Sequence, residues 1–243
     1  MTCDDSLGCV VVRANGPIRL ATLLPTSGET AVWGSELSRG IDIAISDRGS
    51  ELLDHTITLI PLESDCDPNT GLQAIQSISN DETVLGIIGP ACSDVAQAIL
   101  PIVRRTNWLT ISPAATAPDL TDTQSELAFF RTVPNHLHQA TVAATFAFEQ
   151  LGVRQTAVFQ DETAFNSLLA QQFGDTFTAL GGSVVYQNSL AVGDIDLDTM
   201  LLETAVNPPD LIYLALFEPE ANLLVNRLRE NERLSQTPLL GGD

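Results

Sequence analysis

Two hydroxyl side chains, Ser93 and Thr116, follow neighbouring apolar runs and could bind a carboxylate. Ser93 comes directly after Cys92, and Thr116 ends the run SPAAT, whose small side chains leave backbone amides uncovered. Hydroxyl groups, and amides at the start of a helix, donate hydrogen bonds to anions. The backbone carbonyl of Ala114 and the carboxylate of Asp243 could accept hydrogen bonds from an ammonium group. These residue types suit a small ligand that carries both a carboxylate and an ammonium group.

Three aromatic side chains, Trp33, Phe165 and Phe217, could supply apolar walls around such a ligand. Each candidate also has an ordinary structural interpretation. Ser93 alone is better explained as a helix N-cap, and Thr116 could brace a turn. A single aromatic residue usually belongs to the core, and the terminal carboxylate could simply be solvated. The functional interpretation is favoured because all these residues follow expected strands.

The expected elements alternate between strand and helix along the chain. Apolar runs predict strands at 18–24, 56–62, 84–88, 108–111, 129–133, 156–159, 183–187, 210–215 and 238–240. Helical spacing predicts helices at 33–46, 70–79, 95–104, 138–151, 164–180, 197–205 and 220–230. Such alternation predicts parallel sheets with helices on both faces, and ligands bind such sheets at the carboxyl ends of the strands.

The alternation restarts after Pro134, which predicts two lobes, residues 1–133 and 134–243. The last expected strand is followed by no helix that would cover it. We therefore expect the chain to be a truncated form of a longer fold.

Composition and motifs exclude several functions. The 243 residues carry a formal charge of −20, and all eleven basic residues are Arg, so nucleic acid and anionic membranes are unsuitable partners. No apolar run reaches the length of a membrane span. Zinc-type Cys/His spacing and the phosphate-binding and nucleophile-elbow motifs are absent from the sequence, so we expect no metal and no cofactor. Ser93 has no recognisable base, which argues against an enzyme.

The four cysteines, Cys3, Cys9, Cys66 and Cys92, form an even set at wide spacing. This suits two disulfides and an oxidising compartment, although four buried thiols would also fit. The sequence starts without a secretory signal peptide. Cys3 could carry a lipid, but Cys9 offers it a nearer disulfide partner.

One long stretch resembles the leucine/isoleucine/valine-binding protein family, which are type I periplasmic binding proteins that deliver ligands to ABC transporters. The similar residues are IIGPACSDVAQAILPIVRRTNWLTISPAATAPDLT, followed by FFRTVPN. The similarity extends from about Ile18 to Asp243. It implies a two-lobed type I periplasmic-binding-protein fold, in which the family continues beyond this chain to complete both lobes.

The resemblance also assigns roles to the candidate residues. Ser93 and Thr116 match positions that bind the α-carboxylate of an amino acid, and Ala114 and Asp243 match positions that bind its ammonium group. Phe165 and Phe217 match second-lobe aromatics, typically Tyr, that close over the ligand, and Trp33 matches a position near the side-chain pocket. The first-lobe disulfide of the family matches Cys66–Cys92, whereas Cys3–Cys9 lies outside the family framework.

The resemblance leads us to expect a receptor that binds an amino acid, apolar or branched-chain, by lobe closure and performs no chemistry. Its partners would be the ligand and an ABC permease, with the protein a monomer in the periplasm or on the outer face of the membrane. Its signal or lipid anchor would lie outside this sequence. A sensory domain of the same fold, a receptor for a small organic acid and an α/β enzyme are the alternatives.

Overall fold

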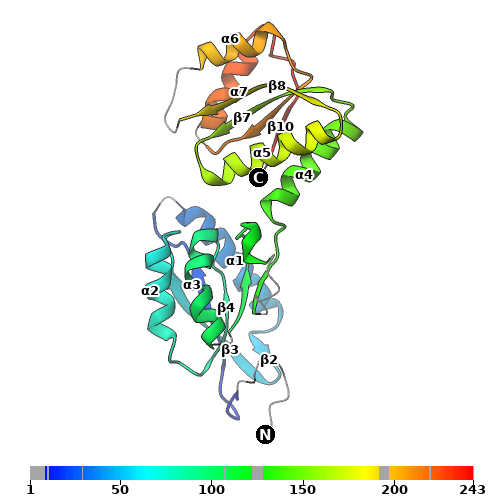
Figure 1. The fold of residues 1–243 in the computed structure, drawn as a ribbon. Coiled ribbons are helices and arrows are strands. Elements are labelled where there is room, and N and C mark those ends of the chain that lie inside the picture. The colour runs from blue at the N-terminus through cyan, green and yellow to red at the C-terminus, as the bar shows by residue number, and fades with distance from the viewer. Residues whose placement is uncertain are drawn as a thin grey trace. The chain divides into compact units, whose positions relative to one another are not determined.

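Two α/β units make up the chain in the computed structural model (Figure 1). The structure describes residues 9, 11–28, 30–106, 108–121, 128–191, 197–218 and 220–242. Internal contacts divide the chain into Met1–Asn135 and His136–Asp243, whereas the sequence places the division after residue 133. Each unit is described by itself below.

The first unit has a six-stranded sheet in the order β2-β3-β1-β4-β5-β6, with every neighbouring pair parallel except β2 and β3. Its strands are β1 (Ile18–Leu24), β2 (Glu51–Leu52), β3 (His55–Glu63), β4 (Val84–Ile88), β5 (Leu109–Ser112) and β6 (Phe129–Arg131). Its helices are α1 (Ala31–Asp47), α2 (Pro68–Ile78), α3 (Ser93–Thr106) and the 3-10 turn η1 (Pro118–Leu120).

Helices α2 and α3 cover one face of this sheet (Figure 1). Alternate strand residues such as Ala21, Leu23 and Ile87 point to that face and pack against Val95 and Ile99 of α3. All five are at most 2% exposed. The apolar spacing of α3 therefore fixes its roll, and its first turn comes to lie at the carboxyl end of β4.

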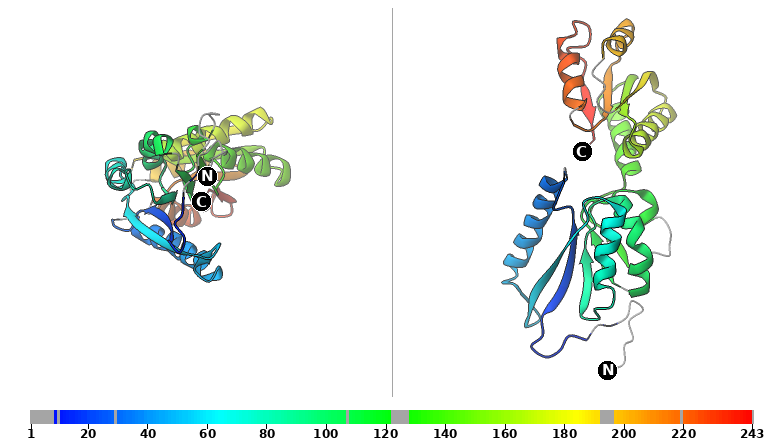
Figure 2. Two further views of the ribbon diagram at one scale, coloured as in Figure 1. Left: turned by 90° about the horizontal axis from the view of Figure 1, so that it is seen from below. Right: turned by 90° about the vertical axis from the view of Figure 1, so that its left-hand side faces the viewer.

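Helix α1 lies on the other side of the sheet from α2 and α3 (Figure 2, right). Its buried residue is Gly34, where an added Cβ would come within 1.7 Å of the Pro25 carbonyl oxygen. The absence of a side chain lets the helix approach the end of β1 this closely. Elsewhere on that side of the sheet, Leu109, Ile111 and Phe130 stay 42%, 38% and 48% exposed.

The second unit has a four-stranded parallel sheet in the order β10-β9-β7-β8. Its strands are β7 (Gln155–Asp161), β8 (Ser183–Leu190), β9 (Leu211–Ala215) and β10 (Leu239–Gly241). Its helices are α4 (His136–Thr145), the π-helical segment η2 (Phe146–Gln150), α5 (Ala164–Ala179), α6 (Asp198–Val206) and α7 (Glu220–Glu230).

Both faces of the second sheet are covered (Figure 1). Val158 and Tyr213 point to the side of α4 and α5, where Phe173 stacks on the Tyr213 ring at 3.9 Å between centroids. Phe159 and Ile212 point to the opposite side, where α6 and α7 lie. This two-sided burial is typical of parallel sheets and explains the nearly continuous apolar runs of the sequence.

The predicted alternation of strands and helices is confirmed, and β1, β4 and α7 have the predicted bounds. The strand β2 was not predicted, and the expected helix 138–151 begins at His136 and changes to a π-helix at Phe146. None of the helices in the described ranges is long and apolar enough to cross a membrane.

Candidate ligand-binding residues

Ser93 is the first residue of α3, which begins two residues before the expected helix 95–104. Its side-chain oxygen accepts hydrogen bonds from the backbone amides of Thr116 and Ala117, both at 3.1 Å. These amides belong to the loop after β5, so the hydroxyl joins two neighbouring strand ends rather than capping its own helix. The N-cap interpretation of Ser93 is therefore wrong.

These two contacts determine what the Ser93 hydroxyl can still do. A serine hydroxyl has two acceptor lone pairs and one hydrogen to donate. The two amides use the acceptor positions, and no acceptor for its hydrogen occurs among the residues that the structure describes. Ser93 is thus oriented as a donor at the positive end of α3, which favours a negatively charged oxygen.

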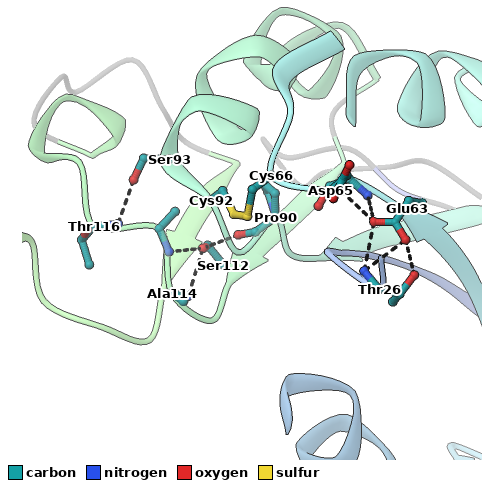
Figure 3. The surroundings of a disulfide bond; sticks show 12 residues. Thr26, Glu63, Asp65, Cys66, Pro90, Cys92, Ser93, Ser112, Ala114 and Thr116 are labelled. Carbon is teal, nitrogen blue, oxygen red and sulfur yellow. Dashed lines mark hydrogen bonds between the residues drawn. A yellow bond between two sulfur atoms is a disulfide. The ribbon is translucent and has the colours of Figure 1, made fainter. Parts of the chain in front are cut away.

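A second serine holds the other half of the same loop. Ser112 is fully buried and donates to the Pro90 carbonyl at 2.6 Å, while its oxygen accepts from the amides of Ala115 at 2.8 Å and Ala114 at 3.3 Å (Figure 3). The two serines therefore pair all four amides of residues 114–117. The expectation that small side chains leave these amides open to a ligand is wrong, because the protein itself uses them.

Arg131 holds the carbonyl side of this loop. Its guanidinium donates to the carbonyls of Ala117 at 2.7 Å and Ala115 at 3.4 Å, and also to the Thr121 hydroxyl. The peptide group between Ala115 and Thr116 is thus bound at its N–H by Ser93 and at its carbonyl by Arg131. The sequence offered no signal for this role of Arg131.

Thr116 and Ala114 are half-buried in this loop, and Figure 3 shows them on the same side of the unit as Ser93. The Thr116 hydroxyl has no hydrogen-bond partner within the described ranges. Trp33 lies in the first turn of α1, after β1, and is 40% exposed. Because β1, β4 and β5 are adjacent and parallel, these residues all follow strands at one edge of the sheet.

A disulfide joins Cys66, in the turn after β3, to Cys92, the residue before α3. The two Cα atoms are 5.5 Å apart and 26 residues separate them in sequence. This confirms the pairing that the family resemblance implies. The bridge ties the turn after β3 to the start of α3, next to Ser93 (Figure 3). The expected Cys3–Cys9 bridge involves Cys3, which lies outside the described residues.

Glu63, the last residue of β3, braces the loop that follows β1. Its carboxylate accepts from the Thr26 amide at 3.0 and 3.1 Å, from the Thr26 hydroxyl, and from the amides of Ser64 at 2.8 Å and Asp65 at 2.6 Å. Burial raises the pKa of Glu63, but these hydrogen bonds outweigh it and lower the pKa below its ordinary value. The carboxylate holds the segment leading to Trp33, a role that sequence reasoning missed.

In the second unit, Phe165 and Phe217 form a stacked pair. Their ring centroids are 5.6 Å apart and the planes differ by 15°, while His136 meets Phe165 edge-on at 5.3 Å. Phe165 is the second residue of α5, after β7, and Phe217 follows β9. Phe217 is 46% exposed, so it is not a core residue. The pair lies at the carboxyl edge of the sheet, because β7 and β9 are parallel neighbours.

Asp161 links the two segments that carry these rings. It is the last residue of β7 and only 3% exposed. One carboxylate oxygen accepts from the Thr163 amide at 2.9 Å and from its hydroxyl, and the other accepts from Asn166 Nδ2 at 2.7 Å and the Phe217 amide at 3.4 Å. No feature of the sequence singled out this residue.

Two further expectations from the sequence concern the carboxylate of Asp243 and the binding of metal ions. Asp243, expected to bind an ammonium group, lies outside the described residues. Across the described ranges, no group of three or more His, Cys, Asp and Glu side chains is placed to hold a metal ion.

Comparison with known proteins identifies the family. The profile of the family described as periplasmic binding protein matches residues 17–242, which is nearly the whole chain. This chain is a member of the periplasmic binding protein family. Its fold, two α/β units with parallel sheets flanked by helices, is the type I fold that the resemblance implies.

Characterised relatives and solved structures agree with this assignment. The chain is 25% identical over 232 residues to the Leu/Ile/Val-binding protein BraC3 of Rhizobium johnstonii, covering 95% of this chain and 62% of that protein. It is 24% identical over 229 residues to the Leu/Ile/Val-binding protein of Escherichia coli K12, covering 91% and 62%. A leucine-binding protein structure from Thermotoga maritima superposes with a TM-score of 0.73 at 28% identity, covering 92% and 63%. The chain thus spans somewhat less than two thirds of the length of these relatives.

Proposed function

We propose that this protein is an extracytoplasmic receptor that captures an amino acid, apolar or branched-chain, for an ABC importer. It binds its ligand by lobe closure, as the family resemblance implies, and it performs no chemistry. The observation that carries the proposal is the Ser93 hydroxyl, whose lone pairs are used by two amides so that its hydrogen is presented to an acceptor. A ligand carboxylate is the natural acceptor at the start of a helix.

The second unit supports the apolar character of the ligand. Phe165 and Phe217 replace the tyrosines expected at these positions, so their stacked rings offer an apolar surface without hydroxyl groups. The half-exposed Phe217 ring would lose water contact on binding an apolar side chain, which is favourable by about 25 cal/mol per Å² of buried apolar surface.

The proposed location and partner follow from the family and the disulfide. A Cys66–Cys92 bridge persists in oxidising compartments such as the periplasm. Relatives named Leu/Ile/Val-binding proteins are 24% and 25% identical over nearly all of this chain. We infer that the protein acts outside the cytoplasm and presents its closed form to a membrane permease.

A receptor for a small organic acid is the second candidate. Ser93 and Thr116 would bind any carboxylate, so this half of the site does not require an ammonium group. The fold does not choose between the ligands either, since structures of this fold were solved with isoleucine, from Streptococcus pneumoniae, and with benzoate, from Rhodopseudomonas palustris. An ammonium partner, a role that the family resemblance gives to Asp243, would distinguish the two candidates.

The experiment that tests this function is a thermal-shift screen of the twenty amino acids and a set of apolar and aromatic carboxylic acids. We expect apolar amino acids to raise the melting temperature, because a ligand that binds only the folded state stabilises it. Ser93→Ala should abolish most of that shift. A receptor function would be excluded if no compound of either class changed the melting temperature of the wild-type protein.

A further inference from the structure

The buried Asp161 carboxylate connects two loops that are 56 residues apart in sequence. One of its oxygens holds Thr163 in the turn before α5, and the other holds Asn166 in the first turn of α5 and the backbone of Phe217. Phe165 lies between Thr163 and Asn166 in the chain. Each of the two stacked rings therefore belongs to a segment that this one side chain restrains.

We propose that Asp161 is a positioning residue that sets the Phe165–Phe217 pair for the ligand. The proposal rests on the proposed function, because it treats the pair as part of the ligand site. Without the carboxylate, β7 and β9 would still pair, with Gln160 beside Ala215, but nothing else described reaches across from the end of β7 to the Phe217 amide. The Phe217 carbonyl also accepts from the Ala221 amide at 2.9 Å, and His136 also contacts Phe165, but each of these contacts holds only one of the two segments. Asp161 joins the two segments, whose rings are 5.6 Å apart.

The four contacts require a carboxylate in this place. All four groups around Asp161 are donors, and an ionised carboxylate has only acceptor positions. An asparagine of the same shape would turn an NH2 group toward one pair of donors. The backbone amides of Thr163 and Phe217 can both only donate, and the shorter contact, 2.9 Å to Thr163 against 3.4 Å to Phe217, favours keeping the asparagine oxygen toward Thr163. The NH2 group then faces Asn166, whose side-chain amide can flip to accept, and the Phe217 amide, which cannot adapt. Asp161→Asn should therefore release the Phe217 loop selectively.

A carboxylate at the other end of β7, the exposed Asp210, provides a control on the same sheet. Asp210 accepts from the amides of Arg154 at 3.0 Å and Gln155 at 2.9 Å, so it also braces β7 with a carboxylate. It contacts neither ring of the stacked pair. Asp210→Asn removes a carboxylate from the same sheet while leaving the Phe217 loop as it is.

The first measurement is hydrogen exchange at the Phe217 amide, followed by NMR in the absence of ligand. We expect Asp161→Asn to accelerate exchange at this amide, and Asp210→Asn to leave it unchanged. The same rate in wild-type protein and in Asp161→Asn would overturn the proposal. Because no ligand is involved, this result is independent of the proposed function.

The second measurement is the calorimetric affinity for L-leucine, or for 4-methylpentanoate if the wild type binds only the acid. We expect Asp161→Asn to weaken binding by roughly fivefold or more, and to cost almost nothing further when Phe217 is already Ala, since coupled residues are not additive. If Asp161→Asn reduced the affinity equally in the wild-type background and in the Phe217→Ala background, Asp161 would have a general structural role and the proposal would be overturned.

A third variant keeps the test informative if Asp161→Asn does not fold by circular dichroism. Asn166→Ala removes the 2.7 Å donor to the same oxygen while leaving the carboxylate in place. We expect Asn166→Ala to reduce ligand affinity less than Asp161→Asn does, and to do so only when Phe217 is present. An equal loss of affinity in the Phe217→Ala background would overturn the proposal. If the wild type binds neither probe, the compound with the largest thermal shift replaces them in the calorimetry. A screen without any thermal shift would instead overturn the proposed function, while the exchange experiment still decides whether Asp161 holds the loop.

Discussion

The side-chain oxygen of Ser93 lies 3.1 Å from the backbone nitrogen of Thr116, although 23 residues separate them in sequence. Through this contact the start of α3 and the loop after β5 form one unit at the carboxyl edge of the first sheet. The hydroxyl that the family resemblance assigns to ligand binding also holds the loop that carries the second such hydroxyl. A substitution of Ser93 would therefore change both the loop structure and the proposed ligand binding, whereas removal of the Thr116 hydroxyl can change ligand binding alone.

Thr116→Val removes a hydroxyl and keeps both the shape of the side chain and the backbone amide that binds Ser93. We expect the variant to bind an amino acid about tenfold or more weakly, because a hydrogen bond to a charged group contributes about 1.5–3 kcal/mol. Its melting temperature should stay close to that of the wild type. Thr132→Val is the control, since its hydroxyl makes only a 3.4 Å contact with the Pro113 carbonyl. Unchanged affinity in Thr116→Val by calorimetry would remove this residue from the site.

Removal of the Cys66–Cys92 bridge, in a variant with serine at both positions, should lower the free energy of unfolding. The closed loop of 26 residues predicts a loss of about 3–4 kcal/mol from chain entropy. Ligand affinity should also decrease, because Cys92 precedes Ser93. Mass spectrometry after alkylation without reductant checks that the bridge is formed. Labelling of both thiols in the folded wild type would contradict both the bridge and the oxidising compartment.

Acidification should destabilise the loop that Glu63 braces. The pKa of Glu63 is lowered in the folded state, so its contribution is complete above the unfolded pKa of about 4.3 and is lost as the pH falls through the folded value. Denaturant titrations of wild type and Glu63→Gln should therefore differ most near pH 7, with the wild type more stable, and converge as the pH falls below about 4. A difference that stays constant or grows on acidification would show that the Glu63 hydrogen bonds do not act in this way.

The sequence was sufficient for the order of the elements because the central strands are short, mainly apolar runs that end at turn residues. It was insufficient for β2, whose hairpin turns at Leu53 and Asp54, both with positive φ. Two-residue turns of this kind usually contain Asn and Gly, so the pair Leu-Asp gave no signal.

The candidate site was predictable to the same limited extent. The positions of Ser93 and Phe217 followed from the rule that ligands bind beyond the carboxyl ends of parallel strands. The pairing of the amides of residues 114–117 with Ser93 and Ser112 did not follow from this rule, because the pairing depends on which strands are neighbours in the sheet. Glu63 and Asp161 were missed for the same reason, since each carboxylate reaches the loop of an adjacent strand.

Asp243→Asn should show whether this carboxylate binds the ammonium group of the ligand. The family resemblance pairs this carboxylate with the ammonium group, and an unpaired charge in a closed site is costly. We expect the variant to lose affinity for an amino acid and to keep or gain affinity for the deaminated acid. Calorimetric titrations with both ligands measure this, and an equal loss for the two would mean that Asp243 does not contact the ammonium group.

The most direct test of the amino-acid assignment compares two ligands that differ only in the amine. Calorimetric titration of the wild-type protein at pH 7 with L-leucine and with 4-methylpentanoate presents the same carboxylate and the same apolar side chain to the site. The account predicts that leucine binds at least about tenfold more tightly, which corresponds to 1.4 kcal/mol or more for the ammonium contact. Tighter binding of the acid than of leucine or any other amino acid would contradict it and identify a receptor for organic acids.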